Sequence, residues 1–72
     1  MAPDPIVTLL DKFEAPFNKH VELHQVLMEN DVRLLRLRIR EGSRFTIMDL
    51  DPVTAERWGR LMTDWAGDQK EP

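Results

Sequence analysis

Three arginines that alternate with aliphatic residues are the side chains of this sequence best suited to bind a ligand. Arg36, Arg38 and Arg40 occupy every second position in the run LLRLRIR. A strand places successive side chains on opposite faces, so the run predicts an aliphatic face and a face of guanidinium groups, here called the Arg face. Guanidinium forks match carboxylate and phosphate oxygens. The Arg face is therefore a candidate surface for a partner's acidic groups or for a nucleic acid, with a solvated face of cross-strand ion pairs as the alternative.

A metal site is the second chemistry to consider, because His20 and His24 form an H-x-x-x-H pair. Such a pair binds zinc when it lies on a helix. The segment favours a strand, where the two residues would lie roughly 13 Å apart and could not share one ion. Glu22 and His24 share a face, but the sequence offers no third ligand beside them. We expect no metal and no other cofactor.

Acid–base catalysis would require paired carboxylates, and Asp49 and Asp51 flank the end of a predicted strand. Asp51 already has a structural role as the N-cap of the following helix. No His, Ser or Lys in the sequence pattern completes a catalytic set with them. The sequence therefore predicts a protein that is not an enzyme.

Small and adaptable residues suggest a surface for a partner. Gly59 lies inside a predicted helix, where glycine costs about 1 kcal/mol relative to alanine, and Ala55 lies one turn earlier. Together they form a notch beside Trp58 that fits close packing of the helix on the sheet, or docking of a partner helix or second copy. Met48 is expected on the Arg face, where Met and Arg together resemble an interface.

The composition limits the classes of protein that need to be considered. The chain has 72 residues and no Cys, so disulfides and thiolate metal sites are excluded. Domains of this size bury only roughly 60% of their unfolded surface and often gain stability by association. A net charge of −3 and a pI of about 5.2 argue against a general nucleic-acid binder. The sequence shows neither a secretory signal nor an apolar membrane span, and we expect a cytoplasmic protein.

The secondary-structure pattern predicts an α+β fold, with an antiparallel β-meander of three or four strands packed against one amphipathic helix. We expect strands over 20–28, 32–40 and 44–50, with turns over 29–31 and 41–43, and a helix over 52–66 that Gly67 ends. The core domain spans 20–66 and a disordered tail spans 67–72. Residues 1–19 form a short helix capped by Asp4, with Ile6, Leu9, Leu10 and Phe13 on one face, or an extended arm on the sheet.

A strand register follows if each turn leaves three residues unpaired. On the aliphatic face Leu23 then faces Leu37, Leu37 faces Ile47 and Ile39 faces Phe45. On the Arg face Glu22 meets Arg38, His24 meets Arg36 and Arg38 meets Thr46. The same register places Met48, Leu34 and Leu50 on the Arg face and turns Asp49 inward. The helix should then lie across the aliphatic face and cover it with Trp58 and Trp65.

The run RLRIREGSRFTIMDLDPVTAERWGRLMTDWA resembles the C-terminal core of small uncharacterised bacterial proteins that form a domain of unknown function. The likeness covers roughly residues 20–66 and implies no activity. The order of strands followed by one helix also resembles the positive-cofactor-type single-stranded DNA-binding domain, which dimerises through its helix. This chain lacks the Lys-rich and aromatic contacts of that family, and its pI is acidic. The resemblance therefore implies a fold more than a function.

The sequence predicts a non-catalytic protein–protein interaction module, either an accessory subunit of a larger complex or a homodimeric adaptor. Its partner-binding residues are expected to be Arg36, Arg38, Arg40, Met48, Ala55 and Gly59. Binding of a single-stranded nucleic acid by a dimer is the disfavoured alternative, and no membrane partner is expected.

Overall fold

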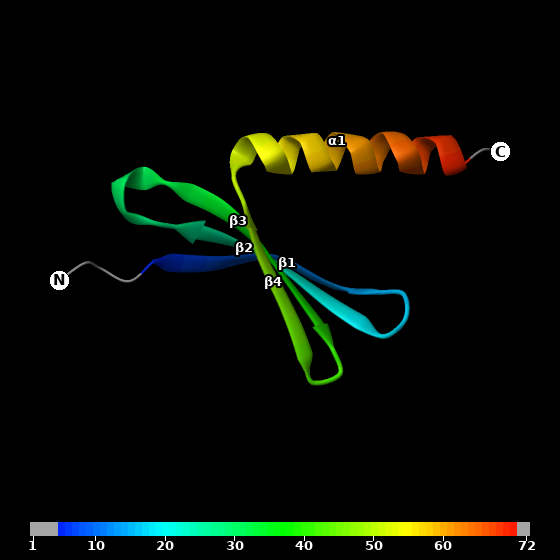
Figure 1. The fold of residues 1–72 in the computed structure, drawn as a ribbon, viewed down its shortest axis with the longest axis horizontal. Coiled ribbons are helices and arrows are strands. Elements are labelled where there is room, and N and C mark those ends of the chain that lie inside the picture. The colour runs from blue at the N-terminus through cyan, green and yellow to red at the C-terminus, as the bar shows by residue number, and fades with distance from the viewer. Residues whose placement is uncertain (1–4, 71–72) are drawn as a thin grey trace.

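Four strands form a single antiparallel sheet in the order of the sequence, and one helix follows them (Figure 1). The computed structural model describes residues 5–70. The elements are β1 (Ile6–Ala15), β2 (Lys19–Leu27), β3 (Arg33–Glu41), β4 (Arg44–Leu50) and α1 (Pro52–Gln69), with a short 3-10 turn at Glu29–Asp31. The α+β class and the meander are confirmed.

The prediction of a short N-terminal helix is wrong, because this segment forms β1, which pairs with β2 as the edge strand of the sheet. The proposed cap Asp4 lies outside the described residues. The pairing of β1 with β2 shifts by one residue between Leu9 and Asp11, which is a β-bulge at Leu10. A bulge interrupts the two-residue alternation of a strand. It leaves Leu9 and Leu10 as adjacent apolar residues, and this gives the segment the apparent spacing of a helix.

The predicted register of β2 and β3 is confirmed. Leu23 pairs with Leu37, Glu22 with Arg38 and His24 with Arg36. The intervening turn uses left-handed backbone at Asn30 (φ 62°) and Asp31 (φ 60°), two residue types that tolerate it.

The predicted register of β3 and β4 is wrong by one residue. Glu41 pairs with Arg44, so the hairpin turn leaves only Gly42 and Ser43 unpaired. Gly42 has a φ of 61°, which glycine adopts without the steric cost that a side chain brings. The pairs are therefore Leu37 with Met48, Ile39 with Thr46 and Arg38 with Ile47. A one-residue shift exchanges the two faces of a strand, so every side chain of β4 lies on the face opposite to the one predicted.

The core of the isolated chain is small. Among the described hydrophobic residues only Val21, Val26 and Leu50 are buried, and Val26 alone is completely enclosed. Leu50 pairs with Leu35 near the start of α1, where the helix approaches β3. One sheet with a helix touching it at one end cannot enclose a larger apolar volume.

Helix α1 does not lie across the sheet, which corrects the predicted packing. It leaves the end of β4 and extends away from the strands as a separate rod (Figure 1). Asp51 is the N-cap and Pro52 the first helical residue, as predicted. The predicted stop at Gly67 is wrong, because the helix continues to Gln69. No helix in residues 5–70 has both the length and the apolar character needed to cross a membrane.

Candidate interaction surfaces

The Arg face is largely neutralised by carboxylates of the same sheet. Arg36 donates two hydrogen bonds to Asp49, from Nε to Oδ1 at 2.8 Å and from Nη2 to Oδ2 at 3.0 Å. This bidentate pair raises the pKa of Arg36 and lowers the pKa of Asp49, in both cases chiefly through the hydrogen bonds. The prediction that Asp49 turns inward is therefore wrong. The shifted register of β4 places it directly opposite Arg36.

The other two arginines of this face are differently engaged. The Nη1 of Arg38 lies 3.7 Å from Oε2 of Glu22, the cross-strand partner that the sequence indicated. Its guanidinium also lies 4.5 Å from the centre of the Phe45 ring, a distance at which a cation is attracted to an aromatic face. Arg40 donates to the carbonyl oxygen of Gly42 at 3.4 Å. Arg40 is thus the arginine of the three for which the described residues provide no carboxylate within 4 Å.

The corrected register changes which residues accompany the arginines. Met48 pairs with Leu37 and lies on the aliphatic face, so its predicted place on the Arg face is wrong. Leu50 moves to the aliphatic face in the same way, while Phe45 and Ile47 join the Arg face opposite Arg40 and Arg38. An Arg face with an exposed aromatic ring was not expected from the sequence, and only the length of the Gly42 turn could have indicated it.

The strongest exposed feature belongs to α1. Its apolar residues recur at helical spacing and form one side of the helix, here called the apolar stripe: Ala55, Trp58, Leu61, Met62 and Trp65. The exposed fractions are 38% for Trp58, 57% for Leu61, 59% for Met62 and 66% for Trp65. An amphipathic helix of a folded protein normally buries such a stripe. Here the fold of a single chain leaves it open to solvent.

The Ala55–Gly59 notch lies on the edge of this stripe and is also unfilled. A Cβ placed on Gly59 would have no heavy atom within 4 Å outside its own helix and its chain neighbours. Packing of the notch against the sheet, the first of the two interpretations of Gly59, is therefore wrong for a single chain.

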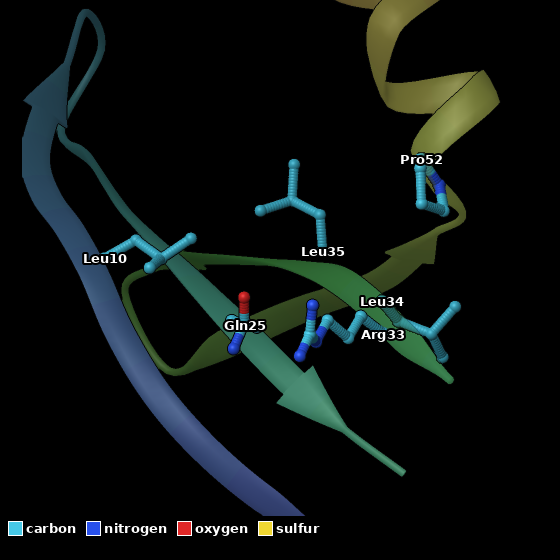
Figure 2. Close-up of a pocket in the computed structure, with 6 residues that line it drawn as sticks. All are labelled: Leu10, Gln25, Arg33, Leu34, Leu35 and Pro52. Carbon is cyan, nitrogen blue, oxygen red and sulfur yellow. The ribbon is translucent and has the colours of Figure 1, made fainter. Parts of the chain in front are cut away.

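An open pocket of about 240 Å³ lies on the sheet beside the start of α1. Figure 2 shows Leu10, Gln25 and Leu35 on three neighbouring strands, with Pro52 of the helix across from them. Arg33 and Leu34 complete its lining. The wall is mostly apolar, so the pocket continues the hydrophobic surface of the first helical turn onto the sheet.

His24 and Asp51, two residues considered for metal and acid–base chemistry, lie near polar groups of the same chain. Nε2 of His24 lies 3.3 Å from Oε1 of Glu22, and no cluster of three His, Cys, Asp or Glu residues suited to a metal occurs within residues 5–70. The pKa of Asp51 is lowered, first by the Thr54 hydroxyl and then by backbone N–H groups of the first turn. Its carboxylate lies near these groups without a capping hydrogen bond of ordinary geometry.

A family model described as a family of unknown function (DUF6967) matches residues 4–68. This agrees with the resemblance to a domain of unknown function and extends it to β1. No curated protein and no solved structure matches the chain.

Proposed function

The chain belongs to the DUF6967 family, whose function is unknown, and from its geometry we propose a non-catalytic protein–protein interaction module that binds through α1. The observation that carries this proposal is the exposure of the apolar stripe on a helix that its own sheet does not cover. Large aromatic side chains dominate the binding energy of protein interfaces, and Trp is among the residues most enriched there. Trp58 and Trp65 supply two such anchors on one side of one rigid element.

The proposed binding surface differs from the one that the sequence suggested. Arg36 and Arg38 have carboxylate neighbours in their own sheet, and a partner's acidic group would have to displace them. The apolar stripe has no such competition. Met48, on the aliphatic face, and the Ala55–Gly59 notch remain in the proposal as apolar and small residues that a partner can cover.

A photo-cross-linking amino acid placed at Leu61 tests the proposal in the cells from which the protein comes. Leu61 lies in the stripe, so we expect a protein adduct there. The matched control is the same amino acid at Val53, which is 77% exposed and lies on the opposite side of the helix. Adducts at both positions, or at neither, would show that the stripe is not the binding surface.

Binding of a single-stranded nucleic acid to the Arg face is a second candidate, and the position of Phe45 favours it. Proteins that bind single strands combine a basic groove with aromatic rings on which bases stack. Phe45 is half exposed and lies beside Arg38 and Arg40. The net charge of −3 and the ion pairs of Arg36 and Arg38 argue for the interaction module as the main proposal.

A labelled oligonucleotide distinguishes this candidate. If the Arg face binds single strands, affinity falls steeply with salt, and Phe45→Ala and Arg40→Ala each weaken it. Arg57→Ala on the polar side of α1 is the control. Absence of binding at low salt would exclude the candidate.

A further inference from the structure

We infer that the partner of the apolar stripe is a second copy of this chain, and that two α1 helices pack antiparallel across a two-fold axis between Leu61 and Met62. This inference rests on the proposed function and names its partner. The isolated chain has a solvent-accessible surface of 6313 Å². A compact monomer of 8.5 kDa exposes about 4,650 Å² according to the usual scaling of surface with mass.

The excess of about 1,650 Å² shows that the single chain exposes more surface than a compact monomer of its mass. The shape agrees with this excess. The radius of gyration is 14.7 Å, whereas a compact domain of this length has one of about 11 Å.

The four large residues of the stripe are spaced symmetrically, which favours a second copy over an unrelated partner. The sequence reads Trp58, Leu61, Met62 and Trp65, with the same spacing in either direction. A two-fold interface must be self-complementary. If residue i of one copy contacts residue j of the other, residue j of the first copy also contacts residue i of the second. In an antiparallel pair centred between residues 61 and 62, Trp58 of each copy meets Trp65 of the other, and Leu61 meets Met62.

In the same arrangement, Trp65 of the second copy lies beside the Ala55–Gly59 notch. The level of Trp65 in the second copy corresponds to position 58, between Ala55 and Gly59. A long helical side chain points back toward the N-terminus of its own helix, so this indole reaches toward the level of Gly59. A glycine with no neighbour in the single chain then becomes the site where the large ring fits.

The charges of α1 favour the antiparallel arrangement. The first half of α1 carries Arg57 and Arg60, with Glu56 paired to Arg60 at 3.0 Å, and the second half carries Asp64 and Asp68. This is the reverse of what the helix dipole favours near a C-terminus, since carboxylates there are repelled by the last carbonyl groups. An antiparallel partner sets Arg57 of each helix toward the acidic half of the other. A parallel partner would set the two acidic halves side by side.

Cysteine pairing and mass measure the arrangement directly, because the natural chain has no Cys. The protein should elute with twice the mass of one 8.5 kDa chain in light scattering coupled to size exclusion at micromolar concentration. Trp58→Cys and Trp65→Cys chains are then mixed and oxidised mildly. An antiparallel pair yields the mixed 58–65 disulfide, and it retains one natural Trp58–Trp65 contact. A parallel pair yields disulfides between equal positions, which would overturn the inference.

Two variants separate loss of the dimer from loss of the fold. Met62→Glu brings a charge to the two-fold axis and should give a monomer, whereas Val53→Asp on the opposite side of the helix should leave the dimer intact. Gly59→Leu adds a side chain whose Cβ has no neighbour within 4 Å in a single chain, and it replaces glycine with a better helix former. It should therefore weaken the dimer at least tenfold while far-UV circular dichroism shows undiminished helix.

The outcomes distinguish this inference from the proposed function. A wild-type protein that has the mass of one chain at micromolar concentration overturns self-association. If its Leu61 adducts with a different protein persist, the interaction function stands with another partner. If the adducts are absent as well, both proposals fail. A dimer that Gly59→Leu and Met62→Glu leave unchanged would place the interface elsewhere and overturn the inference too.

Discussion

At the scale of single residues, the most specific contact of the sheet is the bidentate pair of Arg36 and Asp49. Both side chains are about one third exposed, so solvent screens their attraction. We predict that Asp49→Asn lowers the melting temperature by a few degrees at most at neutral pH. Glu29→Gln, in the turn between β2 and β3, is the control without an ion partner within 4 Å among the described residues. A large loss of stability from Asp49→Asn would mean that the pair is more deeply buried than in the isolated chain.

The same pair predicts a pH dependence with a definite sign. The pKa of Asp49 is lowered from its usual value of 3.8 by the hydrogen bonds from Arg36. A carboxyl group whose pKa is lower in the folded state stabilises the fold above its unfolded pKa, and this contribution is lost as the pH falls through the folded pKa. The melting-temperature difference between wild type and Asp49→Asn should therefore be complete at pH 6 and shrink below pH 3.8. A constant difference down to pH 2 would contradict the assignment.

At the scale of elements, the sequence predicted those strands whose two faces differ in polarity. In β3, aliphatic residues alternate with arginines, and in β2 Leu23 and Glu22 find complementary partners in only one register. The edge strand β1 was predicted less well. Its bulge at Leu10 breaks the alternation, and a bulge depends on backbone pairing that no side-chain pattern specifies.

The predicted register of β4 depended on whether the turn at Gly42 has two or three residues. Both a two-residue and a three-residue turn are compatible with the sequence around Gly42, and both give β4 alternating faces. The choice decided where Met48, Phe45 and Asp49 lie, and hence how the Arg face is composed. The faces of β4 are less distinct than those of β3, because Phe45 and Ile47 on one face are matched by Met48 and Leu50 on the other.

The turn itself supports a prediction. Gly42 has left-handed backbone, and a Cβ added there would have no heavy atom within 4 Å, so only conformational strain opposes a side chain. Gly42→Val should lower the free energy of unfolding by about 1–2 kcal/mol in a urea titration. Gly42→Asn should cost less, because asparagine tolerates this conformation. Equal losses from the two variants would argue against a left-handed turn.

At the C-terminal end of α1, replacing a glycine should raise the free energy of unfolding. Gly67 lies within α1, does not have left-handed backbone and has open space where a Cβ would stand. Gly67→Ala should therefore raise the free energy of unfolding by up to about 1 kcal/mol and increase the helical signal in circular dichroism. A decrease would indicate that Gly67 ends the helix in solution, as the sequence pattern alone suggests.

At the scale of the whole molecule, the sequence predicted the amphipathic helix but not where its apolar stripe lies. Helical spacing shows that Trp58, Leu61 and Trp65 need an apolar environment. It cannot show whether the chain's own sheet or another molecule provides it. In the structure the sheet shelters only the start of the helix, near Leu50. The same residues that sequence reasoning assigned to the core therefore become the proposed interface.

A protein that completes its core by pairing has a stability that depends on its concentration. Because dissociation accompanies unfolding, dilution favours the unfolded chains, and the melting temperature of a two-fold dimer falls on dilution. We predict that the wild-type melting temperature decreases by several degrees on hundredfold dilution, as measured by circular dichroism. Val53→Asp should show the same concentration dependence, since Val53 lies away from the stripe. Met62→Glu should have a lower melting temperature that does not change with concentration. A wild-type melting temperature independent of concentration would mean that the small core around Val26 is sufficient to hold one chain folded.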